Sequence, residues 1–311
     1  MKRGESGINL LLAVNKPEGM SSHDVVNVVR RSVGERRVGH AGTLDPAATG
    51  VLVIGIGQGT RLMGLLTADQ KSYVATIRFG FETSTDDAEG DVTRTAALPD
   101  WLSQQERARG VLESFVGEQE QVPPAYSAIS VNGKRAYARA RSGETVTLEA
   151  RPITVYSAEL LSIEHDDAGA PMWNCAFCVS KGTYIRALAR DLGSAVGSAA
   201  HLSRLCRTAS GLVTLRECIT LADLEQGGAA YAREHAIDPV RALGLPSREL
   251  TSKELQRVQH GGRLSMQEGT LVVGDQLALT SGSRLMGIWK AANGYLAPAV
   301  NFPQGIEGIR L

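Results

Sequence analysis

The chain has 311 residues, more than a usual single domain, so we expect one large domain with a smaller appendage. Its 33 Lys and Arg residues balance 33 Asp and Glu residues. Overall charge therefore gives no sign of an anionic partner, and a nucleic-acid binder must segregate its charge. No apolar run reaches the roughly 18 residues of a membrane helix. We expect no membrane attachment and a reducing, cytoplasmic setting.

A strand and a helix are predicted first. Leu10–Val14 is a short apolar run, typical of a buried strand, that stops at the turn formers Asn15-Lys16-Pro17. Ser22 is expected to cap a helix that runs to about Val33, and Gly34 is expected to end it.

One carboxylate then stands among small residues and turn formers. Asp45 is preceded by Gly42 and followed by Pro46, and the apolar run Val51–Ile54 comes next. This order predicts a loop that leads into a buried strand. Proline disfavours a helical conformation of the residue before it, so the backbone of Asp45 is expected to be extended. A carboxylate positioned in this way is typical of a nucleophile or a base. An isolated Asp-Pro is more often an ordinary turn, and spacing alone leaves that alternative open.

The next segment alternates as a strand and then becomes acidic. Residues 71–80 would place Tyr73, Ala75, Ile77 and Phe79 on one face of a strand. Ten acidic residues against three arginines follow between positions 82 and 120, so this segment is expected to face away from RNA.

A helix and a basic excursion are predicted next. Trp101–Val116 has the spacing of an amphipathic helix. Asn132-Gly133 is a tight-turn signal, and basic residues alternate with alanine and tyrosine over Lys134–Arg141. Basic and aromatic residues on an exposed excursion suit an RNA backbone with unstacked bases.

The last part of the chain predicts a strand, a helix and a small β structure. Cys175–Val179 is expected as a strand, because its Cys-x-x-Cys lacks the second pair that a zinc site needs. Arg186 follows a glycine turn in the first turns of a helix. After Leu245-Pro246 a short helix over Lys253–His260 precedes short strands typical of a barrel or sandwich. Those strands are expected over Thr270–Val273, Gln276–Thr280, Leu285–Ala291 and Tyr295–Val300.

Five ordered stretches together resemble the bacterial TruB family, the tRNA pseudouridine-55 synthases. They cover roughly residues 9 to 215. In chain order they read N-K-P-E-G-M-S-S-H-D-V-V, G-H-A-G-T-L-D-P-A-A-T-G-V-L, K-S-Y, S-K-G-T-Y-I-R-A-L-A-R-D-L-G and H-L-S-R-L-C-R-T-A-S-G.

The resemblance implies a fold and a division of the chain. The fold is an α+β pseudouridine-synthase-like one, with a mixed, largely antiparallel sheet flanked by helices and a small C-terminal PUA-like β-barrel. The catalytic domain is expected at 1–246, with an RNA-clamping insertion at about 122–152. The PUA-like RNA-binding domain is expected at 247–311.

It also implies the site. Asp45, Tyr73 and Arg186 are the expected catalytic residues: Arg186 pairs with Asp45, and Tyr73 packs on the target base and can serve in proton transfer. Ser130 and Cys206 depart from residues common in the family, which puts two RNA contacts in doubt. The expected substrate-binding residues are His40, Gly42, Thr43, Leu205, Lys134, Arg135, Tyr184 and Arg207, with His40 filling space and Leu205 lining the uracil pocket.

The implied reaction isomerises the T-loop uridine of tRNA after flipping it out. It adds and removes no atoms, so we expect no cofactor and no metal, a tRNA T-arm partner and a monomeric protein. Attack of Asp45 on the base, attack on the sugar, and removal of a sugar proton all stay open. A non-catalytic tRNA-binding or folding chaperone is the alternative function. A glycoside or nucleoside hydrolase is disfavoured, because no second acid shares the setting of Asp45.

Overall fold

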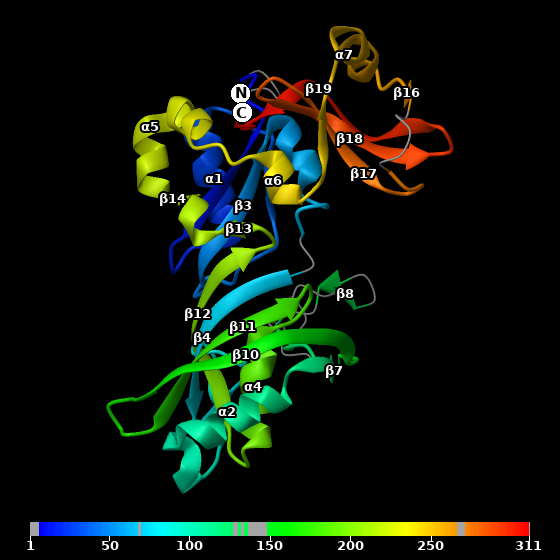
Figure 1. The fold of residues 1–311 in the computed structure, drawn as a ribbon. Coiled ribbons are helices and arrows are strands. Elements are labelled where there is room, and N and C mark those ends of the chain that lie inside the picture. The colour runs from blue at the N-terminus through cyan, green and yellow to red at the C-terminus, as the bar shows by residue number, and fades with distance from the viewer. Residues whose placement is uncertain are drawn as a thin grey trace. The chain divides into compact units, whose positions relative to one another are not determined.

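The computed structural model describes residues 6–67, 70–126, 130–131, 134–135, 148–265 and 271–310, with only the backbone of 130–131 and 134–135. The chain forms two compact units, one made of Met1–Ala68 with Ala209–Leu311 and one made of Asp69–Thr208. Figure 1 shows the helices and strands of both. Among the described residues, no helix is long and apolar enough to cross a membrane.

The first unit is built on antiparallel strands near the N-terminus. β1 (Leu10–Lys16) pairs with β3 (Thr49–Ile56), and β2 (Val38–Ala41) pairs with the other edge of β3. Both long strands are almost entirely buried, which explains their continuous apolar sequence. Helix α1 (Ser22–Val33) and helix α5 (Leu221–Glu234) contribute valines and leucines to the same core.

Helix α1 confirms one predicted end and corrects the other. Gly34 ends it in the left-handed conformation, with φ of 67°. The N-cap is Ser21 and not the predicted Ser22, because Ser21 accepts the Asp24 amide while the Asp24 carboxylate accepts the Ser21 amide. A sequence with two consecutive serines does not say which of them forms this reciprocal pair.

The C-terminal strands belong to the same unit. Their order is β15 (Ser247–Glu249), β17 (Gln276–Ser281), β18 (Arg284–Ala292) and β19 (Tyr295–Glu307), and β19 then pairs with β1. Helix α7 (Ser252–Gln259) and β16 (Leu264–Ser265) share a separate apolar cluster with them that contains Trp289. The predicted short helix and the last three predicted strands are confirmed.

The predicted strand at Thr270–Val273 is wrong over its described part. Residues 271–273 are not in a strand, and Val272 and Val273 are exposed. The Val272 amide donates to the Asp275 side chain, so the segment is held as a turn. Thr270 lies outside the described residues.

In its described residues, the second unit consists of a sheet with helices α2 (Gln105–Ser114) and α4 (Ile185–Ala195). Its strand order is β12 (Ala200–Ser210), β4 (Gln70–Phe79), β11 (Pro171–Ser180), β10 (Arg151–His165) and β7 (Gly117–Gln121). Neighbouring strands from β4 to β7 are antiparallel. In the first unit, β1 pairs with β19 and β15 pairs with β17 in parallel, so the mixed and largely antiparallel character of the predicted fold is confirmed. Helix α4 (Ile185–Ala195) follows β11 directly.

The helix predicted over Trp101–Val116 is interrupted. It divides into a 3-10 turn at Asp100–Ser103 and helix α2 (Gln105–Ser114), because Gln104 is extended with ψ of 108°. Leu102, Ala108 and Leu112 are buried as expected. Two short hairpins complete the unit, β5 (Phe81–Thr83) with β6 (Val92–Thr95) and β8 (Ser130–Val131) with β9 (Lys134–Arg135).

Candidate active site

Asp45 lies on the loop that joins β2 to β3, as the sequence predicts. Gly42 turns the chain after β2 with φ of 76°, a value that L side chains rarely adopt. The Ala48 amide donates to the Asp45 carbonyl at 3.1 Å and closes a turn before β3 begins. The Asp45 side chain is half-buried. The loop therefore presents one carboxylate from a tight turn that is anchored on two paired strands.

The buried ammonium group of Lys16 binds the backbone of this loop. Lys16 is fully buried at the end of β1, and its Nζ donates to the carbonyls of Pro17 at 2.8 Å, Met20 at 2.6 Å and Pro46 at 3.0 Å. The Gly19 amide also donates to the Pro46 carbonyl, at 2.9 Å. Three carbonyl acceptors match the three N–H donors of the ammonium group, which offsets the cost of removing this charge from water. The residue after Asp45 is thus fixed to the Lys-Pro turn.

Ser22 provides a second anchor. Its Oγ donates to the Leu44 carbonyl at 3.0 Å and accepts the Leu44 amide at 2.9 Å. Ser22 and Leu44 are both buried. Ser22, which does not cap α1, therefore fixes the backbone of Leu44, the residue just before Asp45.

Tyr73 lies in the second unit, on β4. It is buried together with Ala75, Ile77 and Phe79 on one face of the strand, which confirms the predicted alternation. Its partner on β11 is Phe177. Burial lowers the pKa of Lys71, on the same face, to about 8, and the positive charge of nearby Arg207 adds to this effect.

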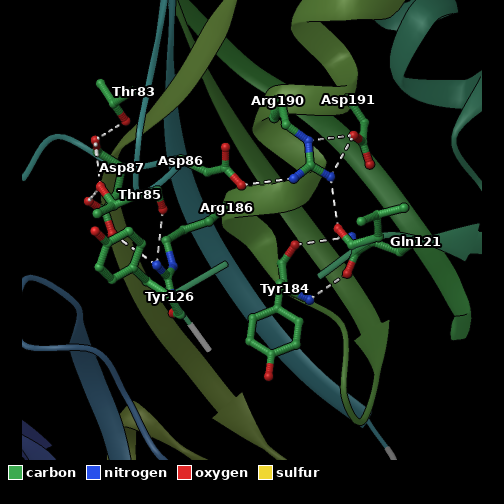
Figure 2. Close-up of polar contacts among 11 residues, drawn as sticks. Thr83, Thr85, Asp86, Asp87, Gln121, Tyr126, Tyr184, Arg186, Arg190 and Asp191 are labelled. Atoms are coloured by element: carbon green, nitrogen blue, oxygen red, sulfur yellow. Dashed lines mark hydrogen bonds and ion pairs between the residues drawn. The ribbon is translucent and has the colours of Figure 1, made fainter. Parts of the chain in front are cut away.

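Arg186 lies in the first turn of α4 and is 6% exposed. Its Nη1 donates to the Thr85 carbonyl at 3.0 Å and lies 3.3 Å from Asp87 Oδ2, and its Nη2 donates to the Tyr126 carbonyl at 3.0 Å (Figure 2). The start of the helix is fixed by Gln121, whose side-chain amide exchanges two hydrogen bonds with the backbone of Tyr184. This bidentate contact aligns α4 and the arginine that it carries.

The acidic loop, residues 81–91, buries one of its carboxylates. Asp87 is buried, and its side chain accepts hydrogen bonds from the Thr85 hydroxyl and, at 3.1 Å, from the Glu89 amide. The Thr83 hydroxyl donates to the Asp87 carbonyl. Acidic composition indicated only a solvated face, so sequence reasoning missed Asp87. The signal was the cluster of hydroxyl and carboxylate residues Thr83-Ser84-Thr85-Asp86-Asp87, whose short polar side chains often form hydrogen bonds with the backbone of their own loop.

Arg190, on the same helix as Arg186, makes half-buried ion pairs. Its Nη1 donates to Asp86 Oδ2 at 2.9 Å, and its Nε and Nη2 donate to Asp191 Oδ1 at 3.1 and 3.0 Å. Burial raises the pKa of Asp86 to about 6, although Arg190 and Arg186 oppose that rise. Burial likewise raises the pKa of Asp191.

The remaining predicted residues fall into the two units as follows. His40, Gly42 and Thr43 lie with Asp45 in the first unit. Arg207 is fully buried on β12, where Leu205 is half-buried. The side chains of Ser130, Lys134 and Arg135 lie outside the described residues. The predicted Asp45–Arg186 pair joins residues of different units and stays a prediction. Besides Lys134 and Arg135, the residues of the second unit that carry predicted roles are Tyr73, Tyr184, Arg186, Leu205 and Arg207.

Cys175 is the most buried of the four cysteines. Cys175 is buried on β11, and burial raises the pKa of its thiol to about 12, as expected of a strand residue. Within the part of the chain that the structure describes, no three His, Cys, Asp or Glu side chains are grouped so as to hold a metal ion.

Comparison with known proteins first identifies the fold. A chain in the crystal structure of a Cbf5-Nop10-Gar1 complex matches with a TM-score of 0.69 and 26% sequence identity, over 96% of this chain and 85% of that one. This similarity places the chain in the pseudouridine-synthase fold, which confirms that part of the predicted fold.

Sequence comparison then identifies the family. A model described as TruB family pseudouridylate synthase (N terminal domain) matches residues 30–185, and one described as tRNA pseudouridylate synthase B C-terminal domain matches residues 186–250. The tRNA pseudouridine synthase B of Arthrobacter sp. (strain FB24) is 42% identical over 307 residues, 96% of this chain and 97% of that protein. That of Thermobifida fusca (strain YX) is 44% identical, over 82% of this chain and 86% of that protein. The chain belongs to the TruB family of pseudouridine synthases, as predicted.

Proposed function

We propose that the protein converts the T-loop uridine of tRNA, position 55, into pseudouridine, with Asp45 as the catalytic carboxylate. The observation that carries the proposal is the anchoring of Asp45: Ser22 holds the residue before it and Lys16 the residue after it. These contacts fix the backbone on both sides of Asp45, so its half-buried carboxylate extends from a rigid loop, as attack or proton removal on a bound nucleotide requires. Family membership supplies the reaction and the tRNA substrate.

Arg186 is proposed to complete the site by pairing with Asp45 on the substrate-bound enzyme. A guanidinium has five N–H donors in a plane, and the acceptors at Thr85 and Tyr126 aim this one. Such a group would hold the Asp45 carboxylate ionised in surroundings that exclude water. Tyr73, on a buried strand face, is proposed to stack on the flipped uracil.

Further parts of the proposal concern the rest of the chain. Residues 247–311 are proposed to be a PUA-like RNA-binding domain, which the separate apolar cluster around Trp289 supports. Residues 1–246 would then be the catalytic domain, with Lys134 and Arg135 in an insertion that clamps the T-arm. The protein is proposed to act as a monomer in the cytoplasm, where its tRNA substrate is found.

The test is incubation with an unmodified tRNA transcript, followed by mapping of pseudouridine. We expect one modified uridine, in the T-loop. Modification at another position would leave the chemistry and contradict the proposed substrate. Release of uracil from the RNA would instead indicate a hydrolase.

A further inference from the structure

Arg186 and Arg190 bind the same two segments of the chain. They lie four residues apart on α4, so their side chains leave the same face of the helix. Arg186 donates to the carbonyls of Thr85 and Tyr126, and Arg190 donates to the Asp86 carboxylate and the Val122 carbonyl. One segment is therefore the acidic loop. The other is residues 121–126, here called the root segment because the predicted insertion begins there.

Four hydrogen bonds hold the Arg190 guanidinium. Asp191 on the same helix accepts two of its hydrogen bonds and fixes its plane. Two further donors are used: Nη1 donates to Asp86 Oδ2 at 2.9 Å (Figure 2), and Nη2 donates to the Val122 carbonyl at 2.8 Å. The acidic loop is shaped for this contact, because Asp86 has φ of 59°, the one positive value of a non-glycine residue in the described chain. Such a conformation is uncommon and persists when the surroundings fix it.

We propose that Arg190 is a positioning residue, which ties the acidic loop and the root segment to α4 and so fixes the two carbonyls that aim Arg186. The proposal rests on the proposed function, in which Arg186 serves the reaction. Without Arg190, the acidic loop and the root segment are no longer tied to α4. Arg186 then keeps its contacts only while both segments stay in place. A small displacement of either carbonyl would turn the guanidinium away from its working orientation.

The first test compares Arg190→Gln with Arg109→Gln, which removes an exposed arginine from α2 in the same unit. We expect Arg190→Gln to lower kcat by about tenfold or more and to leave KM for tRNA within about threefold, because the loss falls on orientation rather than on binding. Arg109→Gln should leave both constants near those of the wild type. An unchanged kcat in folded Arg190→Gln would overturn the proposal.

Arg190→Lys covers the case in which the glutamine variant does not fold. A lysine keeps the charge beside Asp86 but cannot serve Asp191 and the Val122 carbonyl in one plane. We expect an intermediate kcat with normal thermal unfolding. A kcat equal to that of the wild type would show that charge alone suffices and would overturn the positioning role.

A double-mutant cycle separates positioning from general loss of stability. If Arg190 acts through Asp86, then Arg190→Gln combined with Asp86→Asn should be about as slow as Arg190→Gln alone. Independent effects would multiply, and that result would contradict the tie between the acidic loop and α4.

The pH profile gives a readout that a purely structural role would not change. The charged groups that face the Asp86 carboxyl are Arg186, Arg190 and Asp191 of α4 and Glu82 of β5. Because the pKa of Asp86 is about 6, we expect wild-type kcat to fall as the pH drops below about 6 and its carboxylate is protonated. Asp86→Asn should lose this arm, and an unchanged arm would overturn the proposal. Absence of product with the wild-type protein would instead overturn the proposed function.

Discussion

Nη1 of Arg186 lies 3.3 Å from Oδ2 of Asp87, and the two side chains are only 7% and 12% exposed. The arginine predicted to serve Asp45 is thus already compensated by an acidic residue of its own unit. Burial of an uncompensated guanidinium would be costly, so Asp87 allows Arg186 to sit charged beneath the surface. Its carbonyl acceptors, Thr85 and Tyr126, then set the direction in which the remaining donors point.

Substitution of Asp87 should therefore impair the reaction through Arg186. We expect Asp87→Asn to lower kcat by at least tenfold and to lower the free energy of unfolding by about 3 kcal/mol, because it leaves a buried arginine without its counter-charge. Single-turnover pseudouridine formation and urea unfolding measure the two effects. Asp91→Asn, at an exposed acid of the same loop, is the control. Equal rates for the two variants would contradict the role of Asp87.

Asp45→Asn should separate catalysis from binding. The substitution keeps size and loop contacts but removes the charge, so we expect pseudouridine formation to disappear. Affinity for tRNA should stay within about tenfold, since phosphate contacts dominate RNA affinity. Filter binding and product mapping on one transcript measure both. Product equal to that of the wild type would show that Asp45 is not the catalytic carboxylate.

Lys16→Met should destabilise the first unit. Methionine has a similar shape but leaves the carbonyls of Pro17, Met20 and Pro46 without their buried donor. We expect the free energy of unfolding to fall by about 2 to 4 kcal/mol. Urea unfolding measures it, with Lys253→Met, at an exposed lysine of α7, as the control. A loss no larger than in the control would mean that these hydrogen bonds contribute little.

The neighbouring serines of α1 should have different effects. Ser21→Ala removes the helix cap and should cost about 1 kcal/mol of stability with kcat nearly unchanged. Ser22→Ala releases both hydrogen bonds to the backbone of Leu44 and should lower kcat several-fold, because Asp45 loses an anchor. Thermal unfolding and kcat measured on both variants test this contrast. A larger kcat loss in Ser21→Ala would contradict it.

The Asp86 carboxyl should make the free energy of unfolding fall as the pH rises from about 4 to about 6. Its pKa is raised to about 6 in the folded protein from 3.8, so the folded form binds this proton more tightly than the unfolded form. The unfolding free energy due to Asp86 is therefore highest below about pH 4 and falls as the pH rises to about 6.

The measurement is urea unfolding of the wild type and of Asp86→Asn between pH 4 and 7. The wild type should lose stability relative to the variant across that window and then run parallel to it. A difference that stays constant with pH would show that the Asp86 carboxyl is not protonated in this range.

Periodicity predicted the elements that bury one face. Alternation along β4 placed Tyr73 with Ala75 and Ile77, and the apolar runs of β1 and β3 were found as strands. These predictions succeeded because burial of a face is a local property of spacing. The ordered motifs gave the family for a similar reason, since they lie within single stretches of sequence.

Errors arose where a choice depended on partners. Either serine can cap α1, and only the loop at Leu44 decides that Ser22 is used elsewhere. The valines at 272 and 273 have strand character, but Asp275 holds them in a turn. In each case a side-chain hydrogen bond decided between structures that the local sequence allows equally.

The sequence by itself determined the strands with a clear apolar pattern, most of the helices, the loop position of Asp45 and the family. Only the tertiary structure decided what surrounds the predicted residues: Lys16 beneath Pro46, Asp87 beside Arg186, and Arg190 between Asp86 and Val122. The physical reason is that hydrophobic spacing is encoded within about ten neighbouring residues, whereas a buried charge must find its partner wherever the fold brings one. For Arg186 that partner is a carboxylate 99 positions earlier in the chain.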